Sequence, residues 1–330
     1  MTDDSVSGQL WVRGQRVSTA DSRVLRLTRQ QPMDVAFVSN AQLTIPALPV
    51  VPPLKSEIQR VTVVPGFDGV RLPLEQSVMP TAIAITANGD LAMTSLKGHV
   101  VLANDTDGDG LHDSIRVVEE GLAAPFGLFA DGNDLIVAHK PEVVRLTDTD
   151  GDGRTDLRTV VAAGWGYSDN YHDWTTGVVR DREGNLFIGL GSDYSDRARD
   201  PLRDRWRGGI VRADPSGIVT PVAMSMRYPM GLAFDRDGRL FATDNQGVQN
   251  TFNEINHILP GRHYGVPSKF QSDEGIVHES PGLMVPHPWV RSVNAIQFLP
   301  DDYPVETLRG HMIGCEYDNR MLVRFTTQEV

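Results

Sequence analysis

The sequence predicts an all-β protein, a six-bladed β-propeller of which about five blades lie in this chain. A unit of apolar strand, glycine-containing turn and second apolar strand recurs along it. The glycines of four such turns, Gly89, Gly132, Gly184 and Gly238, follow one another at intervals of 43, 52 and 54 residues. These intervals suit blades of four strands with loops of variable length. No stretch has a sustained 3.6-residue apolar period, so we expect little helix.

Each unit begins with two strands joined by a tight turn, which we call strands A and B of a blade. We expect these pairs at 81–85 with 91–93, 125–129 with 135–137, 176–179 with 186–188, 229–234 with 240–242, and 294–298 with 312–314. Outer strands C and D are expected for the first three pairs at 100–102 and 115–118, 143–146 and 157–160, and 210–212 and 218–220. Each blade is therefore predicted to be an A-B-C-D meander.

Both ends of the propeller are predicted to be incomplete. Residues 58–64 have the pattern of a D strand that precedes the first blade, and the chain stops soon after strand C of the fifth. We therefore expect a propeller over 57–330, truncated at its C-terminal end, with most of a sixth blade beyond Val330. Residues 1–56 are interpreted as an N-terminal segment and Pro-rich linker, or the tail of a preceding domain.

The composition argues against several classes of protein. The 330 residues include 43 acidic and 31 basic ones, giving a formal charge of -12, which disfavours a nucleic-acid partner. No apolar stretch approaches the roughly 18–20 residues that a membrane helix needs. The single cysteine, Cys315, excludes an internal disulfide and a C-x-x-C-H haem site. The first residues show no secretory signal, so the compartment stays open at this point.

Two acidic segments match the first nine positions of an EF-hand calcium loop. Residues 105–113 and 148–156 carry carboxylates at positions 1, 3, 5 and 9 and glycine at position 6. Position 12 is Arg116 or Thr159 instead of the usual glutamate. The alternative interpretation is a pair of solvated acidic turns, but the repeated register favours calcium. The predicted ligands are Asp105, Asp107, Asp109, Asp113, Asp148, Asp150, Asp152 and Asp156.

Both calcium loops are expected to join strand C to strand D. In a propeller meander, the C–D and A–B turns lie on one face, while the D–A and B–C loops surround the mouth of the central channel on the other. We therefore interpret the ions as structural and look for the functional site at the mouth. His172, in the loop before strand A of blade three, is a candidate general base or metal ligand. The alternative is a loop histidine bonded to a neighbouring blade.

Several segments resemble the soluble quinoprotein glucose/sorbosone dehydrogenase family. They are residues 227–234, 238–241, 244–247, 253–256 and 261–267. With the two acidic loops and Asn170-Tyr171-His172, the chain is more similar to planctomycete-type (membrane-bound) dehydrogenase-like propellers, which are often fused to cytochrome c. The resemblance runs from about residue 58 to the end, and 227–267 is its most specific part.

The resemblance implies a propeller that holds pyrroloquinoline quinone (PQQ) and calcium at the channel mouth and oxidises a sugar or related alcohol. His172 would then be the general base, Arg227 and Asn245 would bind the cofactor, and the Gly247 carbonyl would bind the cofactor's calcium ion. It also implies a cytochrome c-type electron acceptor and a periplasmic or other extracytoplasmic location.

The chain departs from the family pattern at three places. Tyr228 stands where the dehydrogenases have an asparagine, His172 precedes Gly177 by a longer gap, and Glu316-Tyr317-Asp318-Asn319 replaces an expected lysine. Two other functions therefore stay open. One is a calcium-stabilised propeller that binds glycan or protein without redox chemistry, and the other is a calcium-dependent lactonase-like hydrolase.

Overall fold

The computed structural model describes residues 8–12, 15–17, 35–39, 62–63, 67, 69–72, 78–192, 200–245, 252–265 and 275–326. The chain divides into two compact units, 1–51 and 52–330. The first contains an antiparallel sheet in the order β2-β1-β3, formed by β1 (Gly8–Val12), β2 (Gln15–Val17) and β3 (Val35–Ser39). The sequence interpretation of residues 1–56 did not anticipate this sheet, because its strands are short and lack the repeating unit.

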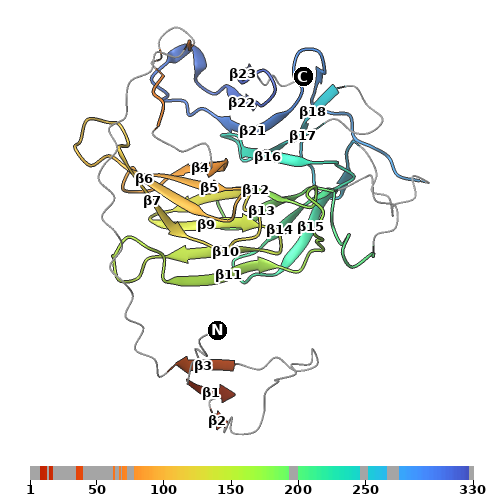
Figure 1. The fold of residues 1–330 in the computed structure, drawn as a ribbon. Helices are drawn as coiled ribbons and strands as arrows, with labels where there is room; N and C mark the ends of the chain where they lie inside the picture. Colours follow the sequence, from red (N-terminus) through yellow and green to blue (C-terminus); the bar gives the residue numbers. More distant parts are fainter. Residues whose placement is uncertain are drawn as a thin grey trace. The chain divides into compact units, whose positions relative to one another are not determined.

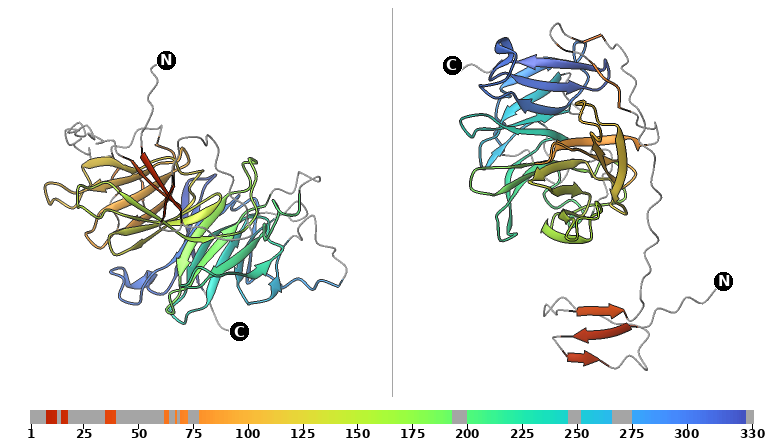
Figure 2. Two further views of the ribbon diagram at one scale, coloured as in Figure 1. Left: turned by 90° about the horizontal axis from the view of Figure 1, so that it is seen from below. Right: turned by 90° about the vertical axis from the view of Figure 1, so that its left-hand side faces the viewer.

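The second unit is an all-β propeller with five blades, which confirms the predicted fold class (Figures 1 and 2). Blade one contains β4 (Pro80–Ile85), β5 (Leu91–Ser95), β6 (Val100–Asn104) and β7 (Ser114–Glu119). Blade two contains β8 (Gly127–Asp131), β9 (Asp134–His139), β10 (Glu142–Thr147) and β11 (Leu157–Ala163). Blade three contains β12 (Thr175–Arg180), β13 (Leu186–Leu190), β14 (Gly209–Ala213) and β15 (Val219–Met224).

Blade four contains β16 (Pro229–Phe234), β17 (Leu240–Asp244), β18 (Phe252–His257) and β20 (Leu283–Pro286), and blade five contains β21 (Val293–Phe298), β22 (Met312–Glu316) and β23 (Met321–Phe325). The short β19 (Arg262–His263) pairs in parallel with β15 and so ties blade four to blade three. The predicted meander is confirmed, since consecutive strands of each blade pair antiparallel. The described residues contain no α-helix, and their longest helical element is the 3-10 turn η2 (Glu306–Leu308).

The A–B turns contain a glycine with positive φ, as the glycine repeat indicates. Gly89, Gly184 and Gly238 have φ of +87°, +89° and +82°, a conformation that glycine adopts without steric cost. In the turn of blade four, the Asp235 carboxylate accepts hydrogen bonds from the backbone N–H groups of Asp237 and Arg239. An aspartate followed by glycine thus closes the hairpin by itself.

Neighbouring blades pack face to face through apolar side chains. Ala92 and Val100 of blade one, for example, share a buried cluster with Leu128 and Val137 of blade two. The A strands of successive blades lie side by side, β4 with β8, β8 with β12, β12 with β16, and β16 with β21, so strand A is innermost. Burial of these faces is the main stabilising contribution to such a fold.

One face of blade one is left open in the described part of the chain. Alternate residues of β4 point to opposite sides, and Ala82 and Ala84 pack toward blade two. Ile83 and Ile85 therefore face away from it, and they are 67% and 58% exposed. Of the D strand predicted at 58–64, only 62–63 are described, outside any strand, and the rest lies outside the described residues. Among the described residues, no helix is long and apolar enough to cross a membrane.

Candidate functional site

The loops divide between two faces of the propeller as the meander predicts. The first acidic segment joins β6 to β7 and the second joins β10 to β11, so both connect strands C and D. His112 of the first loop is hydrogen-bonded through Nε2 to the Gly89 carbonyl oxygen at 3.1 Å. This bond places the C–D loop beside the A–B turn of the same blade. The D–A and B–C loops, which carry His172 and Arg227, lie at the other ends of the strands.

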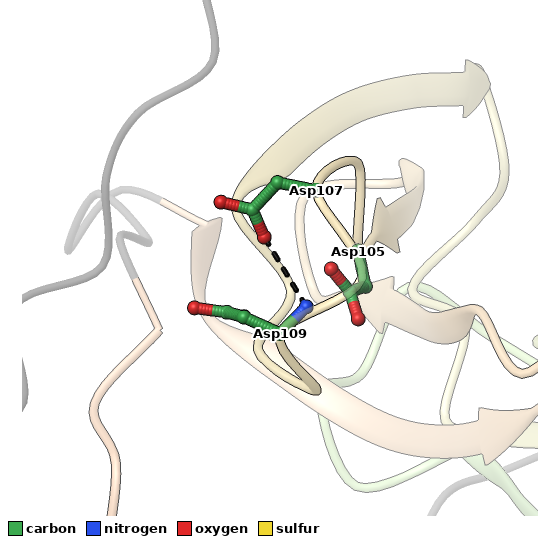
Figure 3. A group of neighbouring side chains, drawn as sticks. All are labelled: Asp105, Asp107 and Asp109. Atoms are coloured by element: carbon green, nitrogen blue, oxygen red, sulfur yellow. Dashed lines mark hydrogen bonds between the residues drawn. The ribbon is translucent and has the colours of Figure 1, made fainter.

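Each acidic loop brings three carboxylates together. Ligand oxygens of Asp105, Asp107 and Asp109 lie within 4.8 Å of one another, and the same holds for Asp148, Asp150 and Asp152. Figure 3 shows the first group on its loop. Asp105 also accepts the backbone N–H groups of Gly108 and Gly110, both at 2.8 Å, and these bonds lower the pKa of its carboxyl. The loops therefore bring together carboxylate oxygens, the type of ligand that a hard cation such as Ca²⁺ prefers.

The fourth predicted ligand of each loop has another role in this structure. Asp113 accepts the backbone N–H of Thr106 at 2.9 Å and its hydroxyl at 2.8 Å. Asp156 makes the equivalent bonds to Thr149, at 2.8 and 2.5 Å. These carboxylates fasten the two ends of each loop together. Arg116, at position 12 of the first loop, lies against Gly153 of the second, where an added Cβ would be 2.8 Å from its guanidinium carbon.

The loop that carries His172 is built by short-range side-chain hydrogen bonds. The Asn170 carboxamide oxygen accepts the backbone N–H of His172 at 2.8 Å, and Ser168 donates its hydroxyl to the buried Asp173 at 2.5 Å. Lys140, from the B–C loop of blade two, donates its ammonium to the Asn170 carbonyl at 2.8 Å. The imidazole of His172 is half-buried. Asx-type bonds of this kind give an irregular loop a defined shape.

Three aromatic residues lie at the mouth ends of three successive blades. We call them the aromatic arc: Phe126, Trp174 and Tyr228. Each stands immediately before strand A of its blade. Phe126 stacks on Trp174 at 4.1 Å between ring centroids, and Trp174 meets Tyr228 edge to face at 5.9 Å. Within the described residues, the buried hydroxyl of Tyr228 has no hydrogen-bond partner. Burial raises the pKa of Tyr228 well above its usual value.

In four blades, a polar residue at the end of strand B is hydrogen-bonded to the loop that precedes strand A of the same blade. In blade one, Ser95 donates its hydroxyl to the Val78 carbonyl. In blade two, His139 Nδ1 accepts the Ala123 N–H at 3.2 Å, and burial lowers the pKa of this imidazole, which favours the neutral form that accepts.

Blades four and five use carboxylates for the same purpose. Asp244 accepts the backbone N–H groups of Arg227 and Tyr228, at 3.0 and 2.6 Å, and Glu316 accepts that of Arg291 at 3.0 Å. Glu316 therefore has a structural role that the sequence reasoning missed. The signal for it is a shared position, since Ser95, His139, Asp244 and Glu316 are each the last residue of an apolar strand B, directly before the B–C loop.

Asp244 and Glu254 form a buried pair of acids at the mouth end of blade four. They are cross-strand neighbours on β17 and β18, with 3% and 5% of their surfaces exposed. Burial and the charge of Glu254 raise the pKa of Asp244 to about 7. Because two adjacent carboxylates cannot both ionise cheaply away from water, the pair holds a proton near neutral pH.

Two of the three predicted cofactor residues lie next to this pair. Arg227 is half-buried and its charge acts on Asp244, and Asn245 directly follows β17. Gly247 lies outside the described residues. The structure brings the His172 and Arg227 loops together at Gly191, where an added Cβ would be 2.9 Å from the His172 carbonyl oxygen and 2.5 Å from the Tyr228 ring.

A buried arginine that the sequence did not single out joins the loops at the mouth. Arg207 is fully buried. It donates through Nε to the Gly166 carbonyl at 2.6 Å and through a terminal nitrogen to the Trp174 carbonyl at 2.8 Å. Longer bonds reach the Gly191 and Lys140 carbonyls, at 3.3 and 3.4 Å. One side chain thus fastens the D–A and B–C loops of blade three to blade two.

Comparison with known proteins assigns the chain to a family. The family described as "Domain of unknown function (DUF7133)" matches residues 81–293, well over half of the chain. The chain belongs to this family. No curated protein matches the DUF7133 chain significantly in sequence.

Solved structures show the fold that this DUF7133 propeller shares. The PQQ-bound aldose sugar dehydrogenase of Streptomyces coelicolor matches with a TM-score of 0.61 and 18% identity, covering 84% of this chain and 83% of that one. The holo PQQ domain of pyranose dehydrogenase from Coprinopsis cinerea gives 0.57 and 15%, covering 74% and 72%. The apo soluble aldose sugar dehydrogenase of Escherichia coli gives 0.58 and 15%, covering 79% and 86%. The predicted resemblance is thus confirmed for the fold.

Proposed function

We propose that this protein is a dehydrogenase that oxidises a sugar or related alcohol with PQQ. The observation that carries the proposal is the position of His172. It stands at the mouth of a propeller whose fold matches PQQ sugar dehydrogenases, in a loop held by Asn170 and Lys140 and next to the Arg227 loop. A general base beside cationic and aromatic groups is what the oxidation of a hydroxyl needs.

The residues at the mouth fit an anionic quinone. Lys140 and Arg227 belong to the loops on either side of the His172 loop and supply positive charge for carboxylate groups. Glu316 carries the opposite charge, but its two carboxylate oxygens accept the N–H groups of Arg291 and Asn319. Although burial works against its ionised form, these bonds hold the pKa of Glu316 below its usual value. Arg227, Asn245 and Gly247 would then hold the quinone and its calcium ion.

The chemistry assigned to this chain is a proton transfer. A bound quinone would supply the acceptor for the hydride from the carbon that carries the hydroxyl. His172 accepts the proton of that hydroxyl, which leaves a carbonyl product, and a neutral imidazole is suited to this step. The electrons would then pass to a cytochrome c-type partner.

Reconstitution of the full-length chain tests the proposal. The protein is incubated with PQQ and Ca²⁺, and bound-quinone absorbance and reduction of an artificial dye are measured with D-glucose, D-galactose and D-xylose. His172→Gln should leave the absorbance unchanged and lower kcat by about 100-fold or more. The control is His112→Gln, on the opposite face, which should keep full activity. Absence of both the absorbance and the dye reduction in the wild-type chain refutes the proposal.

A second candidate is a calcium-stabilised propeller that binds carbohydrate without redox chemistry. It is favoured by Glu316, a buried carboxylate where the resemblance implies a quinone-binding lysine. Sugar binding without any change in quinone absorbance would support this candidate against the first. For the calcium-dependent lactonase, we find no specific supporting observation in the described residues.

We further propose that the two acidic loops bind Ca²⁺ as structural ions. Their clusters lie on the face away from the mouth, so the ions would stabilise C–D hairpins and take no part in catalysis. The concentration of free calcium that such loops need favours a periplasmic or other extracytoplasmic location.

We also propose that a sixth blade completes the ring of a propeller that spans residues 57–330. The exposed apolar side chains Ile83 and Ile85 on one side, and Leu322 on the other at 69% exposure, are the surfaces that it would cover. Residues 1–56 would precede the propeller as a separate segment, with the β1–β3 sheet inside it.

A further inference from the structure

Tyr171 is an exposed aromatic residue at the mouth that the general-base role does not use. Its side chain is 66% exposed, although an aromatic ring is stabilised by burial. It precedes His172 directly, and its ring lies 3.8 Å from the imidazole, tilted by 36°. It also meets Trp174 of the aromatic arc edge to face at 6.4 Å. One part of the ring is thus supported by protein while most of it faces solvent.

The position of this ring is determined in advance. The backbone on both sides of Tyr171 is held, because the Asn170 side chain accepts the N–H of His172 and the Asn170 carbonyl accepts the N–H of Asp173 at 3.2 Å and the ammonium of Lys140 at 2.8 Å. Trp174 is itself stacked on Phe126. A ring fixed in this way loses little conformational freedom when a ligand covers it, which is how rigid aromatic anchors gain affinity.

The surroundings of the ring indicate a ligand with an apolar face and polar edges. Lys140, Asn170 and His172 place hydrogen-bonding groups beside it, and Arg227 belongs to the adjoining loop. These polar groups favour a ligand with hydrogen-bonding groups at its edge over a purely apolar one. A sugar ring presents C–H groups on one face, which are attracted to the negative face of an aromatic ring, and hydroxyl groups around its edge.

We propose that Tyr171 is the platform on which the sugar ring lies, and so a specificity-determining residue that brings the edge of the sugar to His172. The choice of ligand class rests on the proposed function. The contact is made by the aromatic face, so the tyrosine hydroxyl is dispensable. Because the platform contacts the sugar both in the bound substrate and in the transition state, its loss raises KM more than it lowers kcat.

Binding of D-glucose, D-galactose, D-xylose and cellobiose to the full-length chain without PQQ tests the proposal, by calorimetry and by tryptophan fluorescence. For the sugar that binds best, Tyr171→Ala should weaken affinity about tenfold or more, and Tyr171→Phe should stay within about twofold. The control Tyr167→Ala removes another exposed tyrosine of the same loop, 48% exposed, and should have no effect. Melting temperatures of all variants establish that they are folded.

The outcomes separate this inference from the proposed function. If sugar binding depends on Tyr171 but the chain never reduces the dye, the dehydrogenase function is refuted and the role of Tyr171 as a sugar platform is supported. Dye reduction with the same KM in Tyr171→Ala as in the wild type overturns the platform and leaves the dehydrogenase standing. Equal affinities of Tyr171→Ala and Tyr167→Ala, or no binding of any of the four sugars to the wild-type chain, also overturn it.

Discussion

Replacing Arg207 by methionine should destabilise the mouth more than any exposed arginine does. The guanidinium is fully buried and bonds to backbone carbonyls of three separate loops, at Gly166 and Trp174, at Gly191, and at Lys140. Methionine fills a similar volume with an unbranched, adaptable chain, so the change removes the donors and leaves little cavity. The carbonyl groups then remain buried without these partners.

The magnitude follows from the two short bonds. A hydrogen bond from a charged donor contributes about 1.5–3 kcal/mol, so losing the bonds to Gly166 and Trp174, at 2.6 and 2.8 Å, costs about 3–6 kcal/mol. For a domain of this size, about 2 °C of melting temperature is lost per kcal/mol. Arg207→Met should therefore melt about 6–12 °C below the wild type. Arg207→Lys should fall between the two, because an ammonium keeps the charge but not the planar fork of donors.

Equilibrium denaturation in guanidinium chloride, followed by circular dichroism, measures the effect. Arg205→Met is the matched control, since Arg205 lies in the same segment, is exposed, and stacks over Trp206 at 4.1 Å. An exposed site of this kind should change stability by less than about 0.5 kcal/mol. If Arg207→Met and Arg205→Met have the same free energy of unfolding, the claim that Arg207 fastens the mouth loops is wrong.

Two further predictions concern charge. Because the pKa of Asp244 is raised to about 7, the folded protein keeps a proton between about pH 4 and 7 that the unfolded chain has released; the free energy of unfolding should therefore fall as the pH rises through this range and level off above it. Glu254→Gln removes the like charge, lowers that pKa and should flatten the slope in pH-dependent denaturation; an unchanged slope would count against the acid pair. Calcium at about 100 times its dissociation constant should add about 2.7 kcal/mol per acidic loop, seen as a rise in melting temperature that EGTA reverses. The double variant Asp105→Asn, Asp148→Asn should lose this response, whereas Asp214→Asn, in the C–D turn of blade three, should keep it; a response that survives in the double variant contradicts the assignment.

The elements that local chemistry specifies could be predicted from the sequence. Turns such as that at Gly238 depend on a residue that accepts positive φ and on an aspartate three positions earlier, Asp235, and both are visible in the chain. The strand pairs follow because apolar residues alternate around these turns. Strands without such punctuation were missed, as at β19 and β20, where pairing depends on partners far away in the sequence.

The candidate site divides in the same way. The acidic loops could be recognised because all their carboxylates lie within nine residues, yet the use of Asp113 to bind Thr106 appears only in the folded loop. His172 could be proposed from its place before a strand. The resemblance also implied Arg227 at the same mouth. The specific contacts of the His172 loop could not be predicted, since Lys140 and the Arg227 loop are brought to it by blades two and four.

By itself, then, the sequence determined the propeller, the blade repeat and the acidic loops, because each depends on residues that are close in the chain. The tertiary structure alone decided which polar side chains are buried and which groups they are hydrogen-bonded to. Arg207, Asp244 and Glu316 resemble ordinary charged loop residues in the sequence. They hold the mouth loops together because the closely packed blades enclose them away from water, where a polar side chain is stable only if hydrogen-bond partners surround it.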